Sequence, residues 1–430
     1  MSAAKRIVVT GMSVLTPLAD NLEGFLEALL AGRSAIARLR AFDTDNIYVK
    51  VGGDLTGYDE PGKLAALSSL IPEVASVRLR RLMKRAPWAA RLSMLLAVDA
   101  WLNAGLFASS SLNPRRVATL VAGHNINANY QLQNTLRFLD EPDFMDGLFS
   151  VFALDTSHAS LVSEVLQLFG PMYTVGGACA SGNHALRSAI HEIRSNSCDV
   201  AVVLGAVSDF AAPDLHALAL VNAISCQSFN DEPERASRPF DVRREGFVPA
   251  HGGAVLVLEE LEHARRRDAR IYGELLAAGS SADGNHQSQP NETSQADLMT
   301  AVLAEGGVAP EAINYLNAHA TSTPLGDVSE SRAIGRVFGR HTRALKVNAT
   351  KSMLGHTIWA SAVVEIVGAI LQMNAGRLHP SINVDQQDEA IDLDVCSNGW
   401  VPLDVEYFLK NAFGFGGYNA VSLFGRYDGK

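Results

Sequence analysis

Short apolar runs alternate along this chain with longer segments whose apolar residues recur every three or four positions. Apolar runs bounded by Gly, Pro or polar residues predict strands, and the periodic segments predict helices. The predicted strands are Arg6–Thr10, Val117–Val121, Met172–Val175, Val200–Leu204, Gly253–Leu258, Ile271–Ala277, Ala312–Leu316, Ala344–Val347 and Ala420–Phe424. The predicted helices are Leu22–Ala31, Ala89–Asn103, His184–Arg194, Gln295–Ala304, Val328–Phe338 and Ala360–Asn374. This alternation predicts an α/β fold in which helices cover mixed sheets.

Composition narrows the class of protein. A chain of 430 residues can bury one large core or two fused cores. No apolar run is expected to be long enough to cross a bilayer, and the N-terminus has no signal-peptide pattern. We therefore expect a cytoplasmic protein whose four cysteines are reduced. Their spacing suits no metal site, so we expect them to bind no metal. The formal charge of -10 argues against nucleic-acid binding.

Cys179 lies in the most informative stretch, Val175–His184, between a predicted strand and a predicted helix. Its neighbours are Gly, Ala and Ser, which allow a sharp turn and close approach of a substrate. A reactive residue on such a turn is typical of a nucleophile elbow. The positive end of the helix is expected to favour the thiolate. Taken alone, a free cysteine is more often a small buried hydrophobe.

Two distant histidines change that interpretation. His319 follows one predicted strand and precedes a turn rich in Thr, Ser, Pro and Gly, and His356 follows another strand and precedes a helix of small residues. Functional groups in α/β proteins collect at strand ends. A cysteine with two such histidines suits covalent thiol catalysis, because the partners need to be close only in space.

Several motifs occur together in the order that is typical of one family. They are Arg6–Met12, Val175–His184, Ser237–Asp241, Leu256–Glu260, Leu316–Asp327, Val347–His356 and Asn411–Asn419. On these motifs the chain resembles the β-ketoacyl synthases of the thiolase superfamily, nearest the discrete elongating ketosynthases of bacterial fatty-acid and polyketide pathways. The resemblance implies a thiolase fold, a duplicated αβαβα five-layer architecture. Residues 1–260 would form a half that carries the nucleophile, and residues 261–430 a half that carries both histidines.

The resemblance also implies a reaction, the decarboxylative Claisen condensation. Cys179 would accept an acyl group, which the enolate of a malonyl thioester attacks after carbon dioxide is lost. His319 and His356 would stabilise that enolate, and the N–H groups of Cys179 and Phe415 would form an oxyanion hole.

Further roles follow from the same resemblance. Lys351 and Glu365 would organise the site, and Phe415 would act as a gate on a Gly-rich loop. The residues expected to contact substrate are Thr321, Thr323, Ser288, Phe413 and Trp359.

Three positions depart from the elongating enzymes. His251 stands where a carboxylate is usual, Trp359 stands where Gly is usual, and His286–Pro290 is more polar than its counterparts. An indole at position 359 is expected to narrow a channel or repack a helix. These departures favour an enzyme of specialised metabolism over a housekeeping fatty-acid enzyme.

Three alternatives remain open. A malonyl-carrier protein decarboxylase would supply acetyl groups for β-branching, although its members typically carry Ser where Cys179 stands. A non-catalytic partner subunit, like a chain-length factor, would lack the nucleophile. A thiolase acting on coenzyme A would need a second cysteine in a Gly-rich motif, and Cys396 is not in one.

The expected partner is an acyl carrier protein, which presents substrates on its phosphopantetheine arm, so that no other cofactor is needed. An acidic carrier requires a local basic face. A basic run supplies such a face where family members dock their carrier, and Arg265–Arg267 form a second basic cluster. The run consists of Arg78, Arg80, Arg81, Lys84 and Arg85. Such a run is also typical of a solvated helix face. A homodimer is expected, with no nucleic acid or membrane as partner.

Overall fold

The computed structural model describes residues 5–285 and 289–429. The strands are β1 (Ile7–Leu15), β2 (Ile36–Arg38), β3 (Val51–Gly53), β4 (Val117–Ala122), β5 (Met172–Val175), β6 (Val200–Gly205), β7 (Gly253–Glu260), β8 (Gly273–Ala282), β9 (Tyr315–Asn317), β10 (Lys346–Asn348), β11 (Arg377–Leu378), β12 (Asp394–Val395), β13 (Val401–Pro402), β14 (Tyr407–Gly414) and β15 (Tyr418–Gly425).

The α-helices are α1 (Leu22–Leu30), α2 (Glu60–Leu70), α3 (Glu73–Met83), α4 (Trp88–Asn103), α5 (Ala128–Asp140), α6 (Phe149–Phe152), α7 (Thr156–Leu166), α8 (Ser181–Arg194), α9 (Ala212–Leu220), α10 (Leu261–Arg266), α11 (Glu292–Gly306), α12 (Pro324–Phe338), α13 (Lys351–Leu354) and α14 (Ser361–Ala375). Short 3-10 turns connect them: η1 (Leu106–Ala108), η2 (Pro114–Arg116), η3 (Pro142–Phe144), η4 (Ala178–Ala180), η5 (Pro233–Arg235), η6 (Pro310–Ala312), η7 (Gly339–Ala344) and η8 (Ile358–Ala360).

The main sheet repeats one strand arrangement twice. Within the described residues its order is β12-β10-β9-β14-β15-β8-β1-β7-β6-β4-β5. The edge strand β12 stands outside the repeat. The other strands form two groups of five, β5-β4-β6-β7-β1 and β10-β9-β14-β15-β8, which have the same spatial order when the strands of each group are numbered along the chain: third, second, fourth, fifth, first. The directions also match, because in each group two pairs are parallel and two are antiparallel. A short antiparallel contact, Val8 with Glu274 and Val9 with Gly273, joins the groups.

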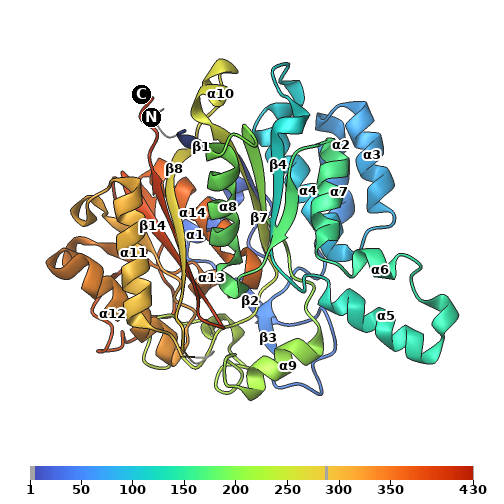
Figure 1. Ribbon diagram of the computed structural model, residues 1–430. Coiled ribbons are helices and arrows are strands. Elements are labelled where there is room, and N and C mark those ends of the chain that lie inside the picture. The colour runs from blue at the N-terminus through green and yellow to red at the C-terminus, as the bar shows by residue number, and fades with distance from the viewer. Residues whose placement is uncertain (1–4, 286–288, 430) are drawn as a thin grey trace.

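Helices divide the molecule into five layers (Figure 1). Helices α4 and α7 pack on the outer face of the first strand group. Helices α11 and α12 pack on the outer face of the second. Helices α8 and α14 lie between the two groups and contact both, and the largest buried apolar cluster surrounds them. The αβαβα prediction therefore holds, and the first turns of both central helices lie where the two halves meet.

Most predicted elements agree with the structure to within a few residues, and two of the differences lie close to the candidate site. Strand β9 begins at Tyr315, three residues later than predicted, because Pro310–Ala312 forms the turn η6. Strand β14 is not predicted, because Lys410 and Asn411 interrupt its apolar pattern. Both differences concern segments that lead into the candidate site.

One expectation about membranes is wrong. By length and composition alone, the stretch Ile358–Ala375 could cross a bilayer, with a mean hydropathy of 1.5 over 18 residues. However, 78% of this stretch is buried inside the protein, because it forms η8 and the central helix α14. Its apolar character is that of a core helix covered on all sides by other elements.

Candidate active site

Cys179 lies on a tight turn between β5 and α8. The turn η4 comprises Ala178–Ala180, and Ala178 adopts a left-handed backbone with φ of 47°. The Ser181 hydroxyl accepts a hydrogen bond from the Gly177 N–H at 2.9 Å and donates one to the Ala178 carbonyl at 2.7 Å. These bonds fix the turn at the start of α8. Local geometry is therefore that of the predicted elbow.

Burial dominates the electrostatics of the thiol. Desolvation raises the pKa of Cys179 to about 11, although the charge of Lys351 acts to lower it. The N–H groups of Cys179 and Phe415 lie against the sulfur and also act to lower the pKa. The cost of burying the charge is larger than these lowering effects, so the net shift favours the thiol in the free protein.

The end of β14 approaches this turn closely. A Cβ atom at Gly414 would lie 2.9 Å from the Ala178 Cβ and 3.1 Å from the Cys179 nitrogen, so only glycine fits without a shift. Phe415 follows at the tip of the β14–β15 hairpin and is 43% exposed. The next residues, Gly416 and Gly417, have φ of 90° and 77°, values that glycine adopts readily.

His356 is buried with one ring nitrogen engaged and the other without a partner. The Ile358 N–H donates to Nδ1 at 3.2 Å, and the Ser361 hydroxyl lies 2.7 Å from the same atom. Because Nδ1 accepts, a neutral ring carries its proton on Nε2. Nε2 is buried and has no hydrogen-bond partner among the described residues. Burial, with the charges of Lys351 and Lys410, lowers the pKa of His356 well below its usual value.

His319 lies beside His356, with ring centroids 5.6 Å apart and ring planes at 81°. Burial lowers its pKa well below the usual value, and Lys351, His356 and Lys410 add to the effect. Glu330, on α12, holds the backbone here by accepting the N–H groups of His319 at 2.9 Å and Ala320 at 2.7 Å. Two neutral imidazoles are thus brought together from β9 and from the segment after β10.

A buried ion cluster supports both histidines. The Lys351 ammonium lies 2.6 Å from Glu365 Oε1 and 3.5 Å from His319 Nδ1. Lys410 lies 2.5 Å from Glu365 Oε2 and donates to the Ala318 carbonyl at 3.0 Å. Burial lowers the pKa of Lys410 to about 8, with a further contribution from Lys351, whereas Glu365 acts to raise it. The carboxylate therefore compensates two lysines at once.

Sequence reasoning missed Lys410 and Glu330. Both are almost completely buried, and a charged residue has a strong prior for exposure. One signal was present: Lys410 immediately precedes the motif Asn411–Asn419 within an otherwise apolar strand. A lysine in such a strand requires a buried counter-charge.

The predicted substrate contacts surround these groups. Thr321 and Thr323 lie on the turn after His319, with their hydroxyl oxygens 3.0 Å apart. The Phe413 ring centroid is 5.9 Å from that of His319. Trp359 lies on η8, which packs against the cysteine turn η4. Ser288 falls outside the described residues.

His251, which stands where a carboxylate is usual, is held by aromatic rings. It stacks on Phe210 and meets Trp88 edge-on, both at 5.1 Å between centroids. The Leu55 N–H donates to its Nδ1 at 3.2 Å. Burial lowers the pKa of His251 to about 4, against a raising effect from Asp54, so this residue is a neutral packing group.

The basic run lies on α3 and the residues that follow it, and much of its charge is already paired. Arg80 pairs with Glu73 at 3.0 Å and Arg81 with Glu164 at 2.8 Å. Arg78 donates to the Val165 carbonyl at 3.0 Å. Lys84 and Arg85 are exposed and have no ion pair within residues 5–285 and 289–429. These two cations are therefore the most available for a partner.

The second basic cluster is largely structural. The guanidinium of Arg267 pairs with the buried Glu259 and donates to the Ala104 carbonyl at 2.8 Å. Arg265 pairs with Glu262 at 2.9 Å. Only Arg266 of the three has no such contact in the described part of the chain.

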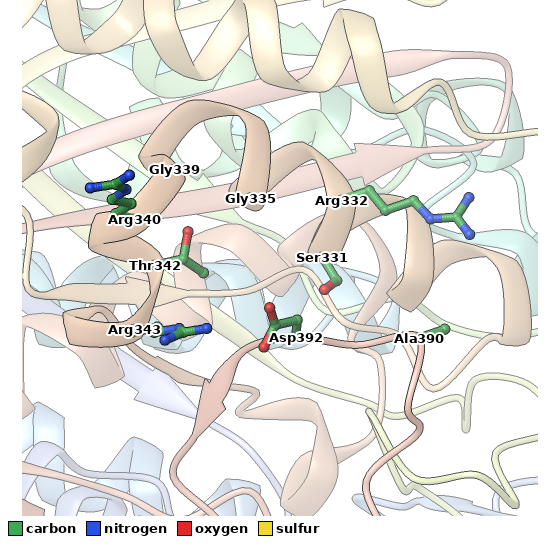
Figure 2. Close-up of a pocket in the computed structure, with 9 residues that line it drawn as sticks. All are labelled: Ser331, Arg332, Gly335, Gly339, Arg340, Thr342, Arg343, Ala390 and Asp392. Carbon is green, nitrogen blue, oxygen red and sulfur yellow. The ribbon is translucent and has the colours of Figure 1, made fainter.

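A separate hollow of about 560 Å³ lies where α12 and η7 meet the segment before β12 (Figure 2). None of the predicted catalytic or substrate residues lines it; the lining residues are Ser331, Arg332, Gly335, Gly339, Arg340, Thr342, Arg343, Ala390 and Asp392. In the part of the chain that the structure describes, no group of His, Cys, Asp and Glu side chains has the arrangement of a metal site.

Comparison with known families agrees with this geometry. The model of the β-ketoacyl synthase N-terminal domain matches residues 4–264, and the model of the C-terminal domain matches residues 272–385. The 3-oxoacyl-[acyl-carrier-protein] synthase 2 of Coxiella burnetii is 32% identical over 428 residues, which cover 98% of this chain and 99% of that protein.

Solved structures give the same result. The ishigamide ketosynthase/chain length factor superposes with a TM-score of 0.87 at 28% identity, covering 99% of this chain and 100% of that one. A type II polyketide ketosynthase bound to its acyl carrier protein superposes with a TM-score of 0.86 at 24% identity over the same shares.

Fold and site together define an acyltransferase built on the thiolase fold. The chain belongs to the β-ketoacyl synthase family. The family and fold predictions are confirmed, and by family the chain is a ketosynthase, an enzyme of the acyltransferase class.

Proposed function

We propose that Cys179 accepts an acyl group and that His319 and His356 drive decarboxylation of a malonyl thioester bound beside it. The observation that carries this proposal is the convergence of three groups: a cysteine on a tight turn, two N–H groups against its sulfur, and a neutral histidine whose Nε2–H has no partner. Lys351 and Lys410 support it, because their charges help to keep both imidazoles uncharged, and Glu365 holds both lysines in place.

The first half-reaction transfers the acyl group. The Cys179 sulfur attacks the carbonyl of the incoming thioester, a C–S bond to the enzyme forms, and the C–S bond to the phosphopantetheine arm breaks. The departing thiol takes the proton that Cys179 loses. Negative charge on the carbonyl oxygen is held by the N–H groups of Cys179 and Phe415.

The second half-reaction makes the carbon–carbon bond. The bond from the malonyl carbon to its carboxylate breaks, carbon dioxide leaves, and the electron pair becomes an enolate whose oxygen accepts hydrogen bonds from His319 and His356. The enolate carbon then attacks the acyl carbonyl on Cys179. The C–S bond between the acyl group and Cys179 then breaks, which releases a β-ketoacyl thioester. The sulfur takes up a proton from solvent, and the thiol is regenerated.

One experiment tests this function directly. The protein is incubated with malonyl-carrier protein, with and without an acyl donor, and the intact masses of enzyme and carrier are followed. A β-ketoacyl carrier that forms only with the donor supports condensation. Acetyl carrier as the only product in both mixtures contradicts it.

That second outcome would support malonyl-carrier protein decarboxylation as the function. One observation favours this candidate: the bulky Trp359 lies on the turn that packs against the cysteine. A non-catalytic partner subunit is disfavoured, because Cys179 and both histidines are retained.

The remaining assignments extend this proposal. The carrier would dock on the basic run at α3 and present its substrates on phosphopantetheine, with no other cofactor. The chain would act as a cytoplasmic homodimer. Residues 1–260 and 261–430 would be its two thiolase-like halves, an assignment that the repeated strand order supports.

A further inference from the structure

Two aromatic side chains in tilted contact close one side of the cysteine turn. The rings of His124 and Trp359 lie 4.1 Å apart between centroids, with planes at 39°. They come from segments more than two hundred residues apart in sequence. Since offset aromatic rings attract each other beyond the area that they bury, this contact holds both segments together.

His124 reaches the cysteine turn through the end of β4. The Gly123 N–H donates to the Val175 carbonyl at 3.1 Å, so the segments after β4 and β5 run side by side. A Cβ atom at Gly176 would lie 3.4 Å from the His124 ring. Gly176 is three residues before Cys179, and the imidazole therefore covers the strand end that leads into the nucleophile.

Trp359 reaches the same place from the opposite side. It lies on η8, which packs against η4, and its Cβ would be 3.3 Å from a Cβ at Gly123. The indole also packs against two apolar clusters, one around α4 and α7 and one around α9. Its Nε1 is buried and has no hydrogen-bond partner in the described residues, so packing alone holds the ring.

We propose that His124 and Trp359 together form a wall that limits the length of the acyl group that Cys179 can hold. The inference rests on the proposed role of Cys179 as acyl acceptor. Because the two rings contact each other and the indole packs against two apolar clusters, a short acyl group would fit beside the sulfur, whereas a longer chain would have to displace the rings. His124 is thus a specificity residue of this ketosynthase.

The test measures acylation of Cys179 by N-acetylcysteamine thioesters of increasing length, from acetyl to octanoyl, using intact mass. The wild-type protein is expected to prefer acetyl over octanoyl by roughly tenfold or more, the scale on which a pocket rejects extra methylenes. His124→Ala and Trp359→Gly should each raise the octanoyl-to-acetyl ratio at least about fivefold on the same scale. His124→Phe keeps an aromatic ring against Trp359 and should retain the wild-type ratio.

The outcomes separate the wall from the proposed function. Variants that accept acetyl and have an unchanged ratio would overturn the wall but leave Cys179 as acyl acceptor. If the wild-type protein accepts no acyl thioester, the variant decides: acylation gained by His124→Ala would support both the wall and Cys179 as acyl acceptor, and no gain would overturn both. The half-buried His341, whose ring is bonded to the Ile313 carbonyl, provides a control: His341→Ala tests the loss of an imidazole elsewhere in the protein.

Discussion

The thiol of Cys179 is subject to opposing influences. Burial raises its pKa to about 11, and Lys351 with two N–H groups acts in the opposite direction. A free cysteine titrates near pH 8.5. At neutral pH the resting enzyme therefore holds a thiol, and the positive end of α8 is available for the oxyanion that forms during reaction.

The first prediction concerns this titration. Because deprotonation follows the raised pKa, alkylation of Cys179 by iodoacetamide should still rise about tenfold per pH unit between about pH 8 and pH 10, where an ordinary cysteine levels off. Peptide mass spectrometry distinguishes Cys179 from Cys226, the other half-buried thiol. A plateau below about pH 9 would contradict a raised pKa for Cys179.

The second prediction concerns the free Nε2–H of His356. His356→Ala should slow decarboxylation of malonyl thioester by roughly 10²–10³, the loss expected for one oxyanion donor. Acylation of Cys179 should change much less, because the N–H groups of Cys179 and Phe415 serve that step. Rates are measured by carbon dioxide release and by intact mass. The exposed His191 on α8 provides a control, and His191→Ala should behave as wild type. Equal loss of both activities in His356→Ala would point to general damage.

These residues differ in how far sequence alone identifies them. Cys179, His319 and His356 are recognised from their motifs, since each combines a reactive side chain with small residues at a strand end. Lys410 and Glu330 carry no such signal, because their burial depends on counter-charges brought from distant elements. Their part in the site follows only from tertiary packing.

At the scale of elements, the site depends on how closely β14 approaches η4. Gly414 has no room for a side chain against Ala178 and Cys179. The third prediction is that Gly414→Ala separates the two N–H groups and lowers acylation and condensation by about 10²–10³, as for loss of an oxyanion donor. Acylation by intact mass measures the effect.

A matched glycine controls for this substitution. A Cβ atom at Gly335, within α12, meets nothing within 4 Å. Gly335→Ala should keep full activity and add up to about 1 kcal/mol of stability, because alanine is the better helix former. Full acylation by the Gly414→Ala variant would contradict the tight approach of β14.

Local patterns predict the elements better than their arrangement. The buried strands and the central helices show clear periodicity, and their predicted bounds are close. The repeated strand order is set by pairings between distant segments, such as β9 with β14, which periodicity along the chain does not encode. Helix α5 is likewise not predicted, and its apolar residues Leu136, Phe138 and Leu139 face outward.

At the scale of the whole molecule, that outward face indicates a partner. Figure 1 shows α5 and α6 projecting from the body, and β5 is the last strand of the sheet order. This region exposes a set of large apolar side chains: Leu136, Phe138, Leu139, Phe144, Val151, Leu154, Phe169 and Met172. Apolar patches and open sheet edges of this kind mark interaction surfaces.

The fourth prediction is that this surface joins two copies of the chain. Light scattering should give a dimer for the wild-type protein, and Leu139→Glu combined with Phe144→Glu should shift it to monomer, because two buried charges would oppose association. Leu325→Glu, at a residue 66% exposed on α12, should leave the dimer intact. A wild-type monomer would mean that the chain has no such interface. A dimer in all three proteins would place the interface on another surface.

The fifth prediction concerns docking of the carrier protein. Lys84 and Arg85 are exposed and free of ion pairs in the described chain, whereas Arg80 and Arg81 are paired with Glu73 and Glu164. Reversing Lys84 and Arg85 to Glu should therefore raise the Michaelis constant for malonyl-carrier protein without breaking contacts inside the enzyme. The effect should shrink as salt rises, because exposed charges are screened beyond about 8 Å at physiological ionic strength.

A small substrate distinguishes docking from damage at the site. Malonyl-N-acetylcysteamine never meets the docking face, so its turnover should be nearly unchanged in the double variant. Arg265→Glu, at an exposed arginine in the second basic cluster, serves as the matched control and should keep the wild-type Michaelis constant for the carrier. Equal loss on both substrates would indicate a defect at the site. If only Arg265→Glu weakened the carrier reaction, docking would belong to the face around α10, where Arg266 is the cation left without a contact in the described residues.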